Sequence, residues 1–200
     1  MNGERESQSE LLSRIDLIEA MVKEGRRGTE YWGWIFVLWG AAYLIAIGWS
    51  YMAQAPQWAW PVTMITATVL TIVLATRKRR RNPQKAISRA VSATWAAAGT
   101  AIFIFCFAVA SSGHMEPHSY MAAIEIFLGL ANFASSIILR WRTQFFIAML
   151  WWVSAIVTCF APLHFVVPIL LIDTFIGFLG FGLYLMYRER NDRRRREQHA

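Results

Sequence analysis

The feature that most constrains this chain is a run of 46 residues, 31 to 76, without a charged side chain. A transmembrane helix needs about 20 apolar residues to cross a hydrocarbon core about 30 Å thick. The run is therefore long enough for two crossings, and the polar residues 54 to 57 divide it in the middle. This pattern predicts a hairpin of two membrane-spanning helices.

Two further apolar blocks follow, at residues 90–139 and 143–187, and each is divided by a short polar turn. Apolar residues make up 56% of the chain and charged residues only 16%. A soluble protein of 200 residues could not cover three apolar hairpins, because it has too little polar surface. We predict an all-α, polytopic membrane protein with six transmembrane helices in three hairpins. The spans are expected at about 31–52, 58–76, 91–111, 119–139, 143–161 and 164–187.

The distribution of basic residues predicts the orientation of these spans. All 20 lysines and arginines lie before the first span, between the second and third, between the fourth and fifth, or after the sixth. Six spans place these four segments on one face, which the positive-inside rule assigns to the cytoplasm. We expect a cytoplasmic segment at 1–30, a membrane domain at 31–187 and a basic cytoplasmic tail at 188–200. The expected location is a bacterial cytoplasmic membrane.

The net charge of +7 follows from this topology, so we predict no nucleic-acid binding. Two basic runs are expected to contact anionic lipid headgroups, at about 1 kcal/mol per charge near the surface. Their residues are Arg77, Lys78, Arg79, Arg80 and Arg81 in the loop after the second span, and Arg193, Arg194, Arg195 and Arg196 in the tail.

Residues 9–25 are predicted to form an amphipathic helix. Ser7 and Glu10 fit a capping box, and the apolar residues at 11, 15, 18 and 22 share one helical face. This helix could pack on the protein's own helix ends, associate with a partner or a second copy, or lie on the bilayer. Surface-seeking helices carry a strongly basic polar face, whereas this one is mixed, which favours the first two alternatives.

Two acidic residues interrupt the predicted spans, Glu125 in the fourth and Asp173 in the sixth. An Asp at the centre of a membrane helix costs about 2.5–3.5 kcal/mol on insertion scales, so it normally faces the bundle interior or a cavity. Every basic residue lies outside the spans, so neither acid has a lysine or arginine partner in the membrane. Asp173 is therefore expected to be protonated, hydrogen-bonded to a group such as Asn132 or a threonine, or exposed to water or a cation.

The surroundings of the two acids share a spacing at offsets 0, 4, 7 and 11. The residues are Glu125, Gly129, Asn132 and Ser136 in the fourth span, and Asp173, Gly177, Gly180 and Tyr184 in the sixth. Small residues allow helix backbones to approach closely, and polar residues hydrogen-bond across the contact. We call each of these two sets of four residues a stripe, and the two stripes could therefore face each other. Glu125, Asn132 and Asp173 are the intramembrane polar candidates for a functional site.

A weaker candidate is a metal site at the connections on the other face. The ligand-type residues there are His114, Glu116, His118 and His164. A structural zinc site requires four ligands in tetrahedral geometry, and these four residues come from two separate connections. These four residues are therefore the metal-ligand candidates, and we predict no cofactor.

The residues favour a non-catalytic role, because no nucleophile–base spacing, P-loop or dinucleotide fingerprint is present. We expect a sensor, regulatory partner or structural subunit that contacts the lipid bilayer, and residues 9–25 are the candidate segment for association with a partner or a second copy. The alternative is a small transporter or channel component with a proton- or cation-linked path through Glu125, Asn132 and Asp173. A water-accessible cavity that reaches Asp173 would favour transport, and a closed core would favour the non-catalytic role.

Overall fold

The computed structural model of the chain is all-α in the part that it describes. The described residues are 14–15, 33–52, 56–81, 86–114 and 116–198. Six helices in this part are long and apolar enough to cross a membrane, which confirms the predicted class and number of spans. The predicted amphipathic helix at 9–25 lies outside the described residues, except for Arg14 and Ile15, which are helical.

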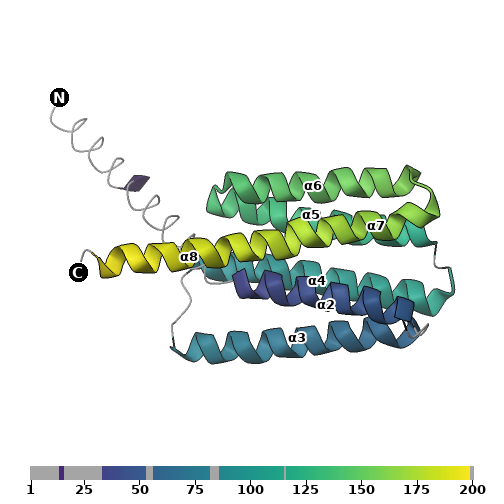
Figure 1. The fold of residues 1–200 in the computed structure, drawn as a ribbon, viewed down its shortest axis with the longest axis horizontal. Coiled ribbons are helices and arrows are strands. Elements are labelled where there is room, and N and C mark those ends of the chain that lie inside the picture. The colour runs from purple at the N-terminus through teal and green to yellow at the C-terminus, as the bar shows by residue number, and fades with distance from the viewer. Residues whose placement is uncertain (1–13, 16–32, 53–55, 82–85, 115, 199–200) are drawn as a thin grey trace.

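The first five spans are single α-helices, and the sixth combines three consecutive helical segments (Figure 1). The first five are α2 (Gly33–Met52), α3 (Pro56–Arg81), α4 (Ala86–Ser112), α5 (Pro117–Leu139) and α6 (Arg142–Phe160). The sixth span consists of α7 (Leu163–Asp173), the π-helix η1 (Thr174–Gly180) and α8 (Phe181–Glu197). Prolines start α3 and α5, where the missing N–H costs no intrahelical hydrogen bond.

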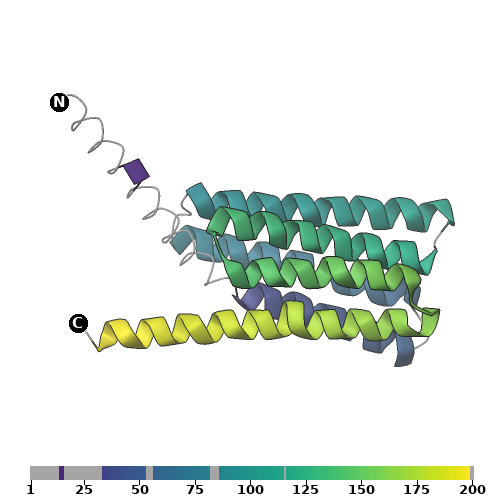
Figure 2. The same cartoon turned by 90° about the horizontal axis from the view of Figure 1, so that it is seen from above.

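The helices run alternately up and down, so their ends gather at two ends of the bundle (Figures 1 and 2). We call the end that carries α8 the basic end, because the helix ends there contain Arg77, Arg89, Arg140 and Arg142. α8 extends beyond the other described helices at this end (Figure 2). The assignment of the basic end to the cytoplasm stays a prediction.

The tightest packing is that of α5 on α6. The sixth span packs mainly on α2, through η1 and α8, and less extensively on α5 and α6. The helices α3 and α4 are peripheral: α3 packs chiefly on α2, and α4 chiefly on α5. Only 6% of the most apolar stretch of α4 and 11% of that of α3 is buried, against 56% of that of α5. The apolar faces of α3 and α4 are therefore the parts of the bundle best suited to contact lipid.

Three glycines allow two of the close contacts between helices. A Cβ atom at Gly129 of α5 would overlap the indole ring of Trp152 of α6. A Cβ at Gly33 of α2 would lie 2.7 Å from the carbonyl oxygen of Gly182 of α8, and the reverse substitution would be equally crowded. Small residues thus bring the helix backbones together, as is common in membrane interiors.

The π-helix η1 changes the face that the sixth span presents to the core. A π-helix contains more residues per turn than an α-helix. Each residue after η1 therefore takes the orientation that the residue before it would have in a regular α-helix. Asp173 and Gly177 are buried as the spacing predicts, but Gly180 and Tyr184 are exposed. Phe181 takes a buried position instead. The predicted face at Gly180 and Tyr184 is therefore wrong, because it assumed a regular α-helix.

Candidate functional site

The two intramembrane acids are held by α6, which lies between them. Ser154 of α6 donates a hydrogen bond of 2.7 Å from its hydroxyl to Oδ1 of Asp173. Thr158 of α6 donates one of 3.2 Å to Oε1 of Glu125. Ser154 and Thr158 are one helical turn apart, so the two hydroxyl groups that bind the acids are separated by about 6 Å along α6. We call Glu125 and Asp173 the acid pair.

The acid pair is closed off from solvent. The exposed fraction of Glu125 is 0% and that of Asp173 is 1%. Residues 90–139 and 143–187 contain no lysine or arginine, so no basic side chain of these spans can neutralise a carboxylate. The second carboxyl oxygen of each acid, Oε2 and Oδ2, has no hydrogen-bond partner among the residues that the structure describes.

Asn132 lies on the same face of α5 as Glu125 but makes no hydrogen bond to the acid pair in the described structure. It is about two turns nearer to the basic end. Its side-chain amide donates a 2.9 Å hydrogen bond to the carbonyl oxygen of Leu128, and its Oδ1 has no partner in the described part of the chain. The structure therefore joins Glu125 and Asp173 through α6 and leaves Asn132 as a separate buried polar group.

The two predicted stripes do not pack directly on each other at their glycines, because both contact α6. The indole of Trp152 covers Gly129, and its Nε1 donates a 3.3 Å hydrogen bond to the carbonyl of Ile126. The indole of Trp151 covers Gly177, with Nε1 2.8 Å from where a Cβ atom would stand. The adjacent tryptophans thus separate α5 from the sixth span at this depth.

Several buried polar residues of this interface were not predicted from the sequence. On α6 they are Gln144, Trp151, Ser154 and Thr158, at offsets 0, 7, 10 and 14. Such offsets keep residues on one face of an α-helix, and this periodicity was the available signal. We use the name polar seam for these four residues together with Glu125, Asn132, Ser135, Asp173 and Thr174, all of which are buried and belong to α5, α6 or the sixth span.

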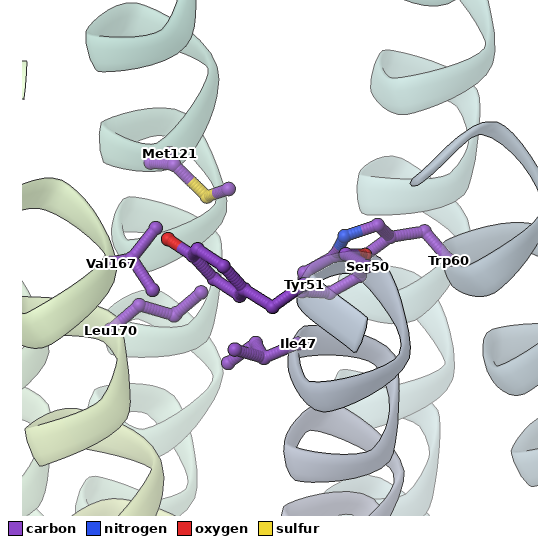
Figure 3. Close-up of a pocket in the computed structure, with 7 residues that line it drawn as sticks. All are labelled: Ile47, Ser50, Tyr51, Trp60, Met121, Val167 and Leu170. Atoms are coloured by element: carbon purple, nitrogen blue, oxygen red, sulfur yellow. The ribbon is translucent and has the colours of Figure 1, made fainter. Parts of the chain in front are cut away.

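An apolar cavity lies near the end of the bundle opposite the basic end, and Figure 3 shows the residues that line it. Its volume is about 210 Å³, and seven residues line it: Ile47, Ser50, Tyr51, Trp60, Met121, Val167 and Leu170. Met121 precedes Glu125 by four residues, and Leu170 precedes Asp173 by three. The cavity lining therefore ends one helical turn before the acid pair.

Glu116 caps the N-terminus of α5. Its carboxylate accepts hydrogen bonds from the backbone N–H groups of Ser119, at 2.6 Å, and His118, at 3.2 Å. These hydrogen bonds, with one from the His118 ring, lower the pKa of Glu116 to about 2. The other ring nitrogen of His118 lies 3.0 Å from the carbonyl oxygen of Ala161, which links the start of α5 to the turn after α6.

The histidines do not form a metal site in the part of the chain that the structure describes. No group of three or more His, Cys, Asp or Glu side chains with metal-binding geometry occurs among these residues. Nδ1 of His114 instead lies 2.8 Å from the carbonyl oxygen of Ser112, and the His164 ring packs on Phe165 at 4.3 Å. Glu116 and His118 belong to the N-terminal cap of α5.

The basic runs extend from helix ends at the basic end. α3 continues to Arg81, and α8 continues to Glu197. Of these basic runs, the side chains of Arg77 and Arg194 are described and exposed. Contact with lipid headgroups stays a prediction for both runs.

Comparison with known proteins leaves the geometry as the basis for a functional proposal. No protein-family model, curated protein or solved structure matched the chain. What the helices establish is a polytopic membrane protein with six candidate spans, and therefore a bilayer environment. The polar seam is the part of this bundle whose chemistry differs most from its surroundings.

Proposed function

We propose that the protein is a non-catalytic membrane protein, a sensor or regulatory partner, in which the acid pair links the helices around α6. The observation that carries this proposal is the enclosure of Glu125 and Asp173, each hydrogen-bonded to a hydroxyl of α6. Polar residues inside membrane bundles commonly join helices in this way, at about 0.6–2 kcal/mol per contact.

The enclosed position of the acid pair supports this role over transport. A transport path requires access from both sides, and the apolar cavity ends one turn before the acids, at Met121 and Leu170. Leu170 has an exposed fraction of 1%, so it covers the approach from that side.

The sixth span offers a physical connection between the acid pair and the basic end. Asp173 is the last residue of α7, and η1 and α8 continue from it as an unbroken helix to Glu197. A change in packing at Asp173 would therefore displace the part of α8 that extends beyond the bundle (Figure 2). This arrangement suits a protein that passes a signal to a partner at the membrane surface.

A small proton- or cation-linked transporter or channel component is the second candidate. Two observations favour it: the unpartnered carboxyl oxygens of the acid pair and the π-helix that begins beside Asp173. Short π-helical segments often occur at functional sites, and interrupted helices line the binding sites of many transporters.

Ion flux into proteoliposomes distinguishes the two candidates. We expect vesicles that contain the protein to show no proton or cation flux above that of empty vesicles under an imposed pH or potential gradient. The matched sample contains the Asp173→Asn variant, which keeps a side chain of the same shape. Flux in the wild type that disappears in this variant would contradict the non-catalytic proposal and support transport.

A further inference from the structure

The polar seam contains an unusual concentration of unpartnered polar atoms. Seven buried side-chain atoms of α5, α6 and the sixth span lack a partner in the described structure. They belong to Glu125, Asn132, Ser135, Gln144, Trp151, Asp173 and Thr174. Buried polar groups in proteins nearly always have a protein or water partner, so seven such atoms on three helices that pack on one another require a common explanation.

These atoms form a series from the acid pair toward the basic end. The indole Nε1 of Trp151 lies beside Gly177, one turn beyond Asp173. Asn132 lies two turns beyond Glu125, and Ser135 follows in the next turn. Gln144 belongs to the first turn of α6, beside the loop at the basic end. The series therefore extends over most of the distance from the acids to that end.

The side of the acid pair that faces away from the basic end is apolar. Met121 and Leu170, one turn beyond the acids, are apolar. Thr158 lies on this side too, but its hydroxyl is hydrogen-bonded to Glu125. Solvent entering from the cavity would therefore meet an apolar layer, whereas solvent entering from the basic end would meet unsatisfied donors and acceptors.

We propose that the polar seam is hydrated and that the acid pair exchanges protons through it with the solution at the basic end. Buried waters typically make about three hydrogen bonds to groups that otherwise lack partners. Glu125 and Asp173 are the charged side chains that the described parts of the bundle bury, and the packed helix α2 adds the phenol of Tyr43. Exchange replaces one proton of a carboxyl group by another from water, so no net transport is required.

Infrared spectroscopy of the protein in lipid nanodiscs tests this exchange. The carbonyl stretching band of a protonated carboxyl group shifts when its proton is replaced by deuterium. The band is assigned by its loss in Asp173→Asn and Glu125→Gln, and pH is lowered until it appears. We expect rapid exchange after transfer of the wild type to D₂O. Absence of the band at every pH, or exchange as slow as global unfolding, would overturn the proposal.

A pair of matched variants tests the route. Asn132→Leu replaces a polar group of the seam by an apolar one of similar shape, so we expect exchange to slow by about tenfold or more. Asn191→Leu makes the same change in α8, beyond the apolar part of the sixth span, and should leave the rate unchanged. Equal rates in Asn132→Leu and the wild type would contradict a route through the seam.

A measurement on the wild type covers the case in which Asn132→Leu does not fold. Radicals generated by brief X-ray exposure oxidise side chains that contact water, including buried water. Trp151 and Tyr43 have exposed fractions of 0% and 5%, and only Trp151 belongs to the seam. We expect faster oxidation of Trp151 than of Tyr43. Background oxidation at both residues would overturn hydration of the seam, whatever the outcome of the flux experiment.

Discussion

Single residues in this bundle act mainly through the space and the hydrogen bonds that they leave to a neighbouring helix. Ser154 and Thr158 would be unremarkable in a soluble helix, but here each provides the hydrogen bond that holds a buried acid. Losing one partner of a buried hydrogen bond costs more than the bond contributes, since the remaining group stays desolvated. The polar seam is therefore sensitive to small substitutions.

Gly129→Ala should destabilise the protein by about 1–3 kcal/mol, because the added methyl group overlaps the Trp152 indole. Gly99→Ala is the matched control, since a Cβ there has no neighbour within 4 Å. The free energy of unfolding can be measured by denaturant titration in detergent. Equal effects of the two substitutions would show that α5 and α6 do not approach as closely as described.

Glu116→Ala should lower stability in a pH-dependent way. The pKa of Glu116 falls from an ordinary value of 4.5 to about 2 in the folded protein, so its contribution is complete above pH 4.5. The contribution is then lost as the pH falls toward 2. We expect the difference in Tm between the wild type and the variant to shrink over this interval. A difference that is constant from pH 6 to pH 2 would contradict the capping role.

Among the helical elements, the sixth span departs most from regular geometry. Asp173 and Leu185 are both buried although they are 12 residues apart, a separation that places two residues on different faces of an α-helix. η1 accommodates the extra residue and returns Leu185 to the face of Asp173. η1 therefore preserves the packing of α7, which precedes it, and of α8, which follows it.

Deletion of Gly180 should be tolerated, because removal of one residue converts η1 into a regular helix without rotating α8. Gly180 is exposed and contributes no side chain to the core. Deletion of Gly99 is the matched control, since it removes an exposed glycine from the regular helix α4 and rotates everything beyond it by about 100°. Thermal unfolding should give a markedly lower Tm for the Gly99 deletion. The opposite order would contradict the register shift at η1.

In the molecule as a whole, the segments with basic residues gather at one end. The guanidinium of Arg188 lies 5.6 Å from the centre of the Trp141 ring, which places a cation over an aromatic face there. Charge segregation of this kind accords with the rule that predicts a cytoplasmic basic end. It also explains why the intramembrane acids have only neutral partners.

Cysteine labelling tests the predicted orientation. In a variant with Cys106 and Cys159 replaced by alanine, Gly113→Cys should react with a membrane-impermeant maleimide in intact cells. Arg190→Cys in α8 should react only after the cells are permeabilised, because the basic end is expected to face the cytoplasm. The reverse pattern would contradict the prediction and place the tail outside.

The number of spans, the gathering of basic segments and the burial of Glu125, Asn132 and Asp173 all follow from the amino-acid sequence by itself. These properties depend on local composition, since an apolar stretch of sufficient length must cross the bilayer and a charge within it must face inward. The contacts between helices could not be predicted in this way, and only the tertiary structure decided them. The local sequence does not indicate which helix is contacted by Ser154, Thr158 and the two tryptophans. The extra residue in η1 is likewise accommodated only because the packing on both sides of η1 stabilises it.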